Sequence, residues 1–262
     1  MLNVYLVDRT QYDHVDLYGA AQILPAEELM RVRGLSHTTD RIMATGDRMI
    51  LRILLSMFSI GTPKRLSIRR DLAGKPYLEN IPLHFNVSHS DSLLAIALST
   101  TPVGVDVERI STSTEVSVIA GTAFASDEVA WLESMDDMRR VRKFTELWSL
   151  KEAHLKRLGV GIAGGLTRLK CVRSGRRFVL ESEDPPANYF SLMCARHTLA
   201  ISTTCLHPPR LHSLLLTSVA NKPKLIRTQL SQPWRRHPVR YDSSDVAALS
   251  KVSEDQKNNM PE

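Results

Sequence analysis

The 262-residue sequence lacks several patterns that carry common enzyme chemistry. It has no Walker-type glycine loop, no His-Glu-x-x-His pair, no glycine-rich dinucleotide turn and no Gly-x-Ser-x-Gly elbow, which argues against the enzyme classes that depend on them. Its three cysteines, Cys171, Cys194 and Cys205, show no CxxC or metal-ligand spacing. We therefore interpret them as reduced, structural thiols of an intracellular chain.

Long apolar runs are also missing. No stretch approaches the ~20 apolar residues that span a bilayer, and residues 1–8 are too short and lack the charged start of a signal peptide. These residues are predicted to form a strand. The sequence therefore predicts a cytosolic protein with no membrane partner, and its 43% hydrophobic content suffices for one large core or two small ones.

Positive charge is concentrated at the C-terminal end. The formal net charge is +6, and from His207 onward nine Lys or Arg stand against five Asp or Glu. The same segment holds six prolines, and its apolar periodicity fades after Leu215. We predict that 207–262 is a basic, proline-containing tail that is mostly disordered. A solvated tail is favoured over a contact of Trp234-Arg235-Arg236-His237 with RNA, a membrane or an acidic partner, because the one aromatic of this sparse basic stretch is no stacking platform.

The first of two informative motifs is a strand pattern, Gly104-Val105-Asp106-Val107-Glu108. The valines alternate with Asp106 and Glu108, so a strand places the two carboxylates on one face, roughly 7 Å apart along the chain. Both carboxylates can then converge on one ion. Gly104 has no side chain, so a ligand or another backbone can approach closely there.

The second motif is helical, Trp148-Ser149-Leu150-Lys151-Glu152-Ala153-His154-Leu155-Lys156. Trp148, Glu152 and Lys156 lie on one stripe of the helix, beside a mostly apolar stripe that would face a core. Gly159 supplies a C-terminal stop. Taken alone, Glu152 with Lys156 is equally well an ordinary exposed helix pair. Combined with the strand motif, the pair indicates a divalent-metal site that handles a phosphate ester.

At these residues the chain resembles the 4′-phosphopantetheinyl transferase superfamily, in particular its longer, single-chain, Sfp-type (surfactin-synthetase-activating) branch. The resemblance extends to Arg48 and Arg52 in an Arg-rich first helix, and to two further blocks. These blocks are Gly74-Lys75-Pro76 and Phe85-Asn86-Val87-Ser88-His89-Ser90. The four blocks occur in the family's order between about residues 40 and 165.

The fold that the resemblance implies is α+β: two similar α/β halves forming an intramolecular pseudo-dimer, each with a small antiparallel sheet packed on a long helix. We place the halves at 1–102 and 103–206. Patterns in the first half predict strands at 2–7, 83–88 and 93–99 and a helix near 38–59. Those in the second predict a strand at 103–109, helices within 127–158, and strands at 166–172, 177–181, 189–195 and 198–204. We expect a monomer with its site between the halves.

The chemistry that the resemblance implies is transfer of the 4′-phosphopantetheine group from coenzyme A to a serine of an apo acyl or peptidyl carrier protein, releasing adenosine 3′,5′-bisphosphate. Mg²⁺, with Mn²⁺ as an alternative, suits oxygen ligands and phosphate chemistry. Asp106, Glu108 and Glu152 are the expected metal ligands. Glu152 is also expected to take the proton of the carrier serine, and Lys156 to stabilise or protonate the leaving phosphate.

Coenzyme A contacts are assigned to basic and hydroxyl side chains. Lys75, Ser88 and His89 are expected to hold the 3′-phosphoadenosine end, while Lys151 and Arg52 add charge for phosphates. His89 alone would be read as a structural histidine, and only its Ser-His context reverses that. Other arginines near the start of the chain are further candidates without a clean match to the family, namely Arg31, Arg33, Arg41 and Arg48.

Which carrier is used stays open from the sequence: carriers of fatty-acid, polyketide, nonribosomal-peptide and aminoadipate-dependent lysine synthesis all present a serine at the start of a helix on an acidic domain. Carrier contacts are expected between about Ile110 and Thr145. Two other functions remain, a coenzyme A-binding scaffold without activity and an adaptor that acts through the basic tail. Deletion after about Leu215 separates the adaptor from the transferase, because transferase activity should survive it and adaptor function should not.

Overall fold

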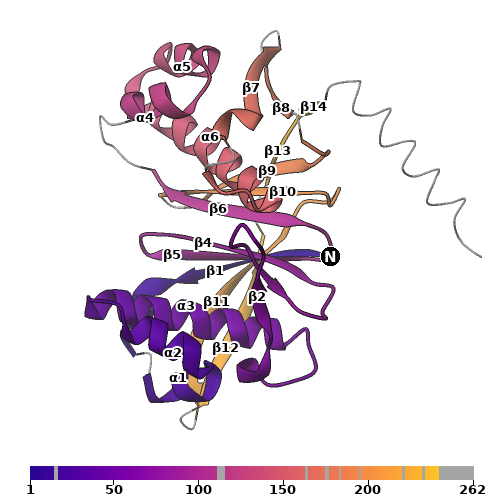
Figure 1. Ribbon diagram of the computed structural model, residues 1–262. Helices are drawn as coiled ribbons and strands as arrows, with labels where there is room; N and C mark the ends of the chain where they lie inside the picture. The colour runs from indigo at the N-terminus through magenta and orange to yellow at the C-terminus, as the bar shows by residue number, and fades with distance from the viewer. Residues whose placement is uncertain are drawn as a thin grey trace, which may run out of the picture.

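A computed structural model describes residues 1–14, 17–110, 116–162, 165–174, 177–182, 184–194, 196–219, 222–231 and 234–241. The fold is α+β, as predicted, with two main sheets and helices on the outer face of each (Figure 1). The first sheet has the strand order β12-β11-β1-β5-β4 and the second has the order β13-β9-β10-β6. Two small sheets, β14-β8-β7 and β2-β3, lie beside them.

The predicted strands and helices lie close to their expected positions, and the structure adds short elements that the sequence patterns did not predict. Up to residue 99 they are β1 (Leu2–Asp8), η1 (Arg9–His14), α1 (Leu17–Ile23), α2 (Ala26–Arg33), α3 (Thr38–Ser56), η2 (Pro63–Arg65), β2 (Ile68–Arg70), β3 (Pro76–Leu78), β4 (His84–Ser90) and β5 (Leu93–Ser99). From 103 to 203 they are β6 (Val103–Arg109), α4 (Val116–Ala123), α5 (Ser126–Glu133), α6 (Asp137–Leu158), η4 (Leu166–Arg168), β7 (Leu169–Ser174), β8 (Arg177–Ser182), β9 (Asn188–Cys194) and β10 (His197–Thr203).

The last strands contradict the predicted disordered tail. Residues of the tail form β11 (Arg210–Val219), β12 (Lys222–Leu230), β13 (Arg235–His237) and β14 (Val239–Tyr241). β11 pairs in parallel with β1, which makes the first sheet mixed, and β13 pairs with β9. The prediction failed because it gave the prolines and charges of the segment more weight than the leucines of β11, which complete a sheet in space. Residues 242–262 lie outside the described residues.

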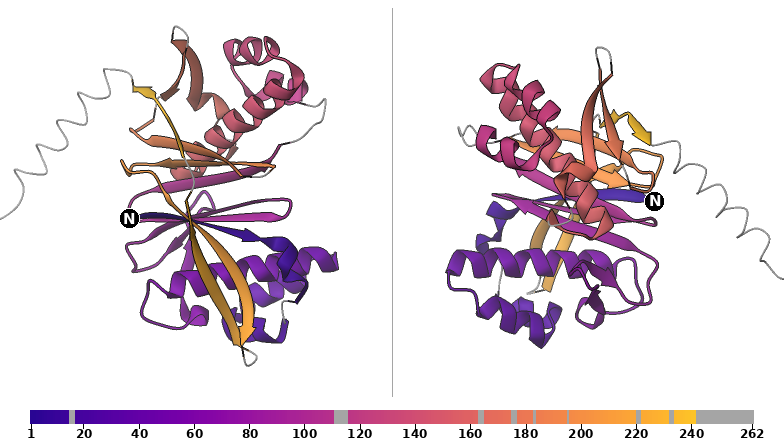
Figure 2. Two further views of the ribbon diagram at one scale, coloured as in Figure 1. Left: turned by 180° about the vertical axis from the view of Figure 1, so that it is seen from behind. Right: turned by 45° about the horizontal axis from the view of Figure 1, so that its top comes forward.

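The layers run helix, sheet, sheet, helix. α3 covers the outer face of the first sheet, and α6 covers the outer face of the second, while the two sheets pack on each other (Figures 1 and 2). Val103, Val105 and Val107 lie between the sheets, fully buried. The sequence prediction that these valines share a face opposite to the acids is confirmed.

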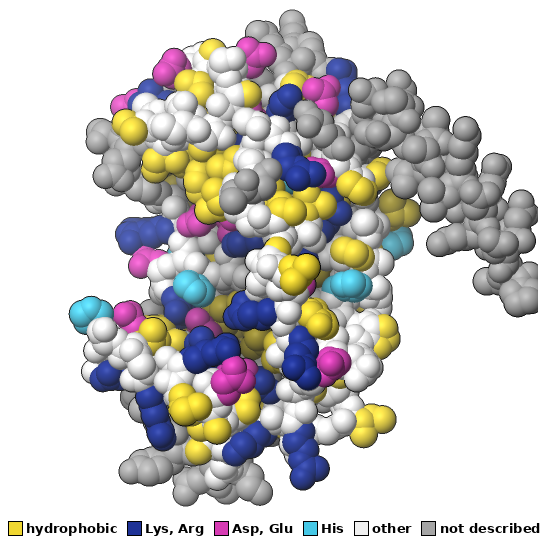
Figure 3. Space-filling model, viewed as in Figure 1, with side chains coloured by type: hydrophobic (Ala, Val, Ile, Leu, Met, Phe, Trp, Pro, Cys, Tyr) yellow, Lys and Arg dark blue, Asp and Glu magenta, His cyan; other side chains and the backbone are white. Residues whose placement is uncertain are grey.

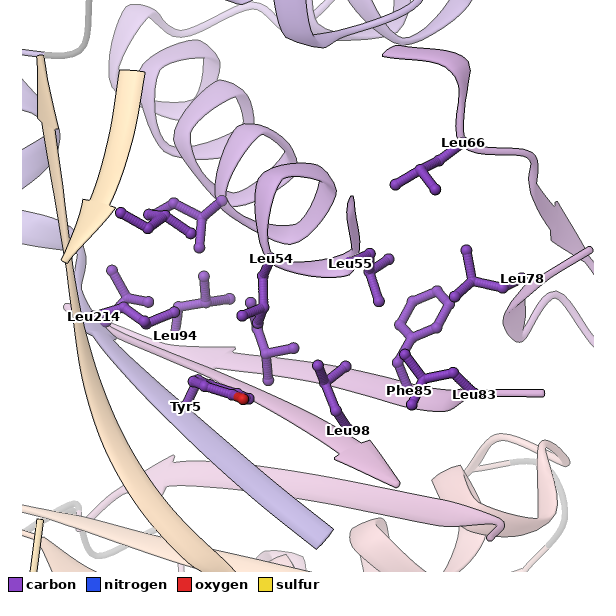
Figure 4. Packing of buried hydrophobic residues seen from close by; sticks show 14 of the residues in the cluster. Tyr5, Leu54, Leu55, Leu66, Leu78, Leu83, Phe85, Leu94, Leu98 and Leu214 are labelled. Atoms are coloured by element: carbon purple, nitrogen blue, oxygen red, sulfur yellow. The ribbon is translucent and has the colours of Figure 1, made fainter. Parts of the chain in front are cut away.

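The core between α3 and the first sheet is built from side chains of distant segments (Figure 4). Leu54 and Leu55 of α3 meet Phe85 of β4, and Leu214 of β11 joins the same cluster. α3 places these leucines on one face because apolar residues recur at helical spacing. Because β11 supplies part of this core, deletion after about Leu215 would remove β12 and truncate β11. The prediction that transferase activity survives this deletion therefore no longer follows.

Within the described residues, no helix combines the length and apolar character that crossing a bilayer requires.

A leucine pair on β11 tests whether the C-terminal hairpin is part of the core. Leu214 is 4% exposed and Leu215 is 39% exposed, because neighbours on a strand face opposite sides. We expect Leu214→Ala to lower the free energy of unfolding by about 2–5 kcal/mol, and Leu215→Ala to change it by about 0.5 kcal/mol or less. Chemical denaturation measures both, and equal small effects would show that the hairpin does not pack as described.

Candidate active site

The two sheets meet edge to edge where β4 lies beside β6. Alternate polar side chains of β4 reach across this seam. Asn86 Oδ1 accepts a hydrogen bond from the Val105 amide at 2.8 Å, and Ser90 Oγ accepts one from the Arg109 amide at 3.0 Å. These amides lie on the edge of β6 that β10 does not cover, so the side chains replace a missing strand. The Phe-Asn-Val-Ser-His-Ser block therefore fixes the position of the strand that carries Asp106 and Glu108.

A cluster of charged groups occupies the middle of the seam. Ser88 Oγ donates to Asp106 Oδ1 at 2.9 Å, and Lys156 Nζ donates both to Asp106 Oδ1 at 2.5 Å and to Ser88 Oγ at 2.9 Å. Ser90 Oγ donates to Glu108 Oε2 at 3.1 Å. The structure thus unites the strand motif, the helix motif and the serine block, which come from three separate elements.

Gly104 allows α6 to come this close to β6. A Cβ atom at position 104 would lie 2.0 Å from the Ala153 carbonyl oxygen and 2.4 Å from the Arg157 amide nitrogen. Both are backbone atoms and cannot rotate away. The prediction that Gly104 admits another backbone is confirmed, and the approach brings Lys156 to Asp106. Gly159 ends α6 in the left-handed conformation, with φ 78°, as its position in the sequence predicted.

Two carboxylate oxygens at this cluster are buried without a hydrogen-bond partner among the described residues: Asp106 Oδ2 and Glu152 Oε1. Asp106 is 1% exposed and Glu152 is 8% exposed. Burial raises the pKa of Glu152, which Lys156 counteracts. Burial, with the neighbouring Asp106 charge, raises the pKa of Glu108 to about 7. Burial and mutual repulsion destabilise the charged forms of these acids. A bound cation would relieve that destabilisation.

The donor set fits a hard divalent cation. Orphaned carboxylate oxygens of Asp106 and Glu152 are the ligand type that Mg²⁺ takes, with few protein ligands needed. As the side chains lie, no group of three His, Cys, Asp or Glu residues converges on one point within the described ranges. Lys156 instead compensates the charge of Asp106. The assignment of Asp106, Glu108 and Glu152 as a metal-ligand set stays a prediction.

The predicted coenzyme A residues do not all gather here. Lys75 Nζ donates to the Arg157 carbonyl at 2.7 Å, at the end of α6, and burial followed by the Arg157 charge lowers the pKa of Lys75 to about 8. Ser88 lies in the carboxylate cluster, whereas His89 is exposed and faces the opposite side of β4, near Asp47. Ser88 and His89 therefore do not act as adjacent contacts, because neighbouring strand residues point to opposite faces.

Arg52 was wrongly assigned to phosphate binding. Its guanidinium is 3% exposed, forms an ion pair with Glu28 at 2.6 Å, and donates to the carbonyls of Pro63 and Leu66 at 2.8 and 3.1 Å. These bonds tie α3 to α2 and to the segment after it. Exposed Lys and Arg side chains are nonetheless frequent on the face of the N-terminal half that Figure 3 shows.

Lys151 was also wrongly assigned. It is 0% exposed, its ammonium forms an ion pair with Glu128 at 3.0 Å, and it donates to the carbonyls of Leu166 and Leu169. It points into the core on the far side of α6 from Lys156, since residues five apart on a helix do not share a stripe. The motif therefore combines one structural lysine with one lysine of the site.

A buried network that the sequence did not reveal anchors the back of α6. Tyr189 pairs through its hydroxyl with His154 Nδ1 at 2.8 Å, and His154 Nε2 lies 2.9 Å from Asp184 Oδ2. Arg168 forms an ion pair with the same Asp184. Burial lowers the pKa of His154 to about 4, although Asp184 opposes the shift. Only the spacing of His154 on the apolar stripe could have suggested this role.

Replacement of Gly104 tests the close approach of α6. We expect Gly104→Ala to lower the free energy of unfolding by about 1–3 kcal/mol or more, because backbone atoms must shift. Gly121→Ala is the matched control, since a Cβ there meets nothing within 4 Å and α4 is helical. The control should leave stability unchanged or slightly higher. Equal stability of both variants in a denaturant titration would contradict the packing described for Gly104.

The buried histidine predicts a pH dependence of stability. Because the pKa of His154 in the fold, about 4, lies below its ordinary value of 6.5, the unfolded chain binds more protons between these values. The contribution of His154 to stability therefore falls as pH is lowered from 6.5 towards 4. The His237 pKa is lowered to about 4 as well and adds to the same slope. We expect His154→Gln to reduce the slope by up to one proton in denaturation measured across this range, and an unchanged slope would argue against a neutral, buried His154.

Comparison with known proteins agrees with this geometry. The model of the 4′-phosphopantetheinyl transferase superfamily matches residues 102–202, and the model described as 4′-phosphopantetheinyl transferase, N-terminal, matches residues 12–101. The two matches adjoin between residues 101 and 102. The strands β11, β12 and β13, which complete the two main sheets, lie beyond both matches.

Individual relatives carry the same description. A 4′-phosphopantetheinyl transferase of Aneurinibacillus migulanus is 36% identical over 45% of this chain and 48% of its own length. The transferase HetI of Nostoc sp. is 31% identical over 56% and 64%, and Sfp of Bacillus subtilis is 34% identical over 34% and 40%. The matched segments thus span about two fifths to two thirds of these relatives. On the strength of both matched models, which together cover residues 12–202, the chain belongs to the 4′-phosphopantetheinyl transferase superfamily.

Proposed function

We propose that this protein is an enzyme that transfers the 4′-phosphopantetheine group of coenzyme A to a serine hydroxyl of an apo acyl or peptidyl carrier protein. The observation that carries the proposal is the cluster at the seam, where Lys156 contacts Asp106 beside the orphaned oxygen of Glu152. Membership of the superfamily and relatives named as transferases support it.

The reaction breaks the phosphoanhydride bond of coenzyme A and forms a phosphate ester bond to the carrier serine. The carrier serine oxygen attacks the phosphorus that bears the pantetheine arm, and the bond from that phosphorus to the bridging oxygen breaks. Adenosine 3′,5′-bisphosphate leaves, and the serine proton passes to Glu152, directly or through water. The raised pKa of Glu152, caused by its burial, makes it a stronger base than an exposed glutamate.

Lys156 serves the leaving group. Its side chain is 28% exposed and its ammonium already lies at the seam between Asp106 and Ser88, so it can stabilise or protonate the departing phosphate. Bound at Asp106, Glu108 and Glu152, Mg²⁺ or Mn²⁺ would supply positive charge to the phosphate oxygens as negative charge develops there. Ser88, next to both charged groups, is the hydroxyl best placed to meet a phosphate at this cluster.

The other end of coenzyme A is assigned to the N-terminal half. Lys75 and His89 are the proposed contacts for the 3′-phosphoadenosine end, at opposite margins of β4. Lys75 is half-buried and its pKa is lowered to about 8, so it is mostly cationic at neutral pH. It would exchange the Arg157 carbonyl for phosphate, and this makes it a weaker candidate than Ser88.

Carboxylate replacements test the assignment. We expect Asp106→Ala and Glu152→Gln each to abolish transfer while circular dichroism stays unchanged, because each removes an oxygen needed at the cluster. Glu133→Gln, at an exposed position on α5, is the matched control and should transfer normally. Intact-mass spectrometry of purified apo carrier proteins with coenzyme A and Mg²⁺, and with EDTA as a second control, reports the gain of one phosphopantetheine. Near-normal turnover in either carboxylate variant would contradict the assignment of that carboxylate to the active site.

A further inference from the structure

A cavity between α6 and the second sheet lies next to the carboxylate cluster. Its volume is about 560 Å³. One wall is the first half of α6, the floor is β9 and β10, and β13 closes the far side. Its lining residues are Met135, Arg139, Arg142, Lys143, Glu146, Ser191, Leu192, Met193, Thr198 and Arg235.

The charge of the lining is strongly positive. Four cationic side chains face one anionic side chain, Glu146. Lys143 and Arg235 both pair with Glu146, at 2.5 and 3.5 Å. The Arg142 side chain is exposed and forms no hydrogen bond or ion pair in the part of the chain that the structure describes. Charge complementarity therefore calls for an acidic occupant.

The cavity also offers apolar contact. Met193 on the floor is 51% exposed, and Met135 lines the same space. Flexible methionine side chains adapt to varied apolar partners. The hollow lies between a helix and a sheet rather than on a flat face, which suits the side chains of an acidic, amphipathic helix better than a lipid surface.

The position of the cavity connects it to the reaction. Thr198 is the direct cross-strand partner of Glu108, and Met193 is the direct partner of Thr198. Such partners share one face of the sheet and lie on strands ~4.8 Å apart, so the floor reaches Glu108 within about 10 Å. Along α6, Arg142 precedes Glu152 by ten residues, or about 15 Å. An occupant of ordinary domain size would overlap the cluster.

We infer that this cavity is the docking surface for the acidic carrier protein, with Arg142, Arg235 and Met193 as its contacts. The inference rests on the proposed function and names its protein partner's binding face. Arg235 belongs to β13, which lies beyond the residues that either family model matches. Carrier choice in this chain therefore depends partly on a segment that the shared family region does not contain.

Charge removal at the cavity tests the inference. The test variants are Arg142→Glu alone and Arg142→Glu combined with Arg235→Gln. Arg142 has no partner to lose, so the single variant should fold normally. Arg65→Glu is the matched control, because Arg65 is exposed on η2 in the N-terminal half. Transfer is measured with an apo acyl carrier protein varied at saturating coenzyme A and Mg²⁺, and then with coenzyme A varied.

The double variant should raise KM for the carrier about tenfold or more, with kcat and KM for coenzyme A within about twofold of the parent values. Added salt should raise the parent's carrier KM more steeply than the variant's. The control should match the parent. An unchanged carrier KM in the double variant, with an active parent, overturns the docking surface. If the double variant instead loses binding to phosphatidylserine vesicles while its KM for the carrier stays unchanged, the cavity is a membrane contact and the docking surface is overturned.

Failure of the proposed function looks different: the parent protein itself would add no mass to any carrier. In that case calorimetric titration of the parent and the variants with the same apo carrier still decides the docking surface. Binding by the parent that Arg142→Glu weakens supports it. Equal binding by both, or no binding by the parent, overturns it.

Discussion

The seam between β4 and β6 is the constraint on which the site depends. Both strands are sheet edges, and an uncovered edge leaves amides without partners. Asn86 and Ser90 satisfy the amides of Val105 and Arg109 from the neighbouring sheet. Because Ser88 lies between them on the same face of β4, its hydroxyl meets Asp106. The same alternation that joins the two sheets thus places a hydroxyl against the carboxylates.

Two further features hold the helix of the site against this seam. Gly104 lets the backbone of α6 touch β6, and the His154–Asp184–Arg168 network fixes the far side of α6. The chain after residue 207 then returns to the first sheet through β11 and to the second through β13. The two sheets are therefore linked by packing, by the seam and by the chain itself. These links give a stable geometry to a site that is built from residues of both sheets.

Much of this arrangement was predictable from the sequence, because periodicity marks which face of β6 or α6 is apolar and the four motif blocks occur in order. Asp106, Glu152 and Lys156 lie together as their spacing suggested, whereas Ser88, which was assigned to the 3′-phosphoadenosine end, also lies in this cluster. Lys151 and Arg52 were misassigned because a charge in a motif does not reveal a buried partner, here Glu128 and Glu28. Contacts between distant segments, such as β11 with β1, leave no local pattern to find.

A crystal structure with Mn²⁺, recorded at a wavelength where manganese scatters anomalously, tests the central claim most directly. The account predicts one anomalous peak within coordination distance of Asp106 and Glu152, with Lys156 displaced from Asp106 towards a bound phosphate when coenzyme A is present. Lys156 keeping its contact with Asp106 while manganese binds elsewhere, or binds nowhere at millimolar concentration, would contradict it.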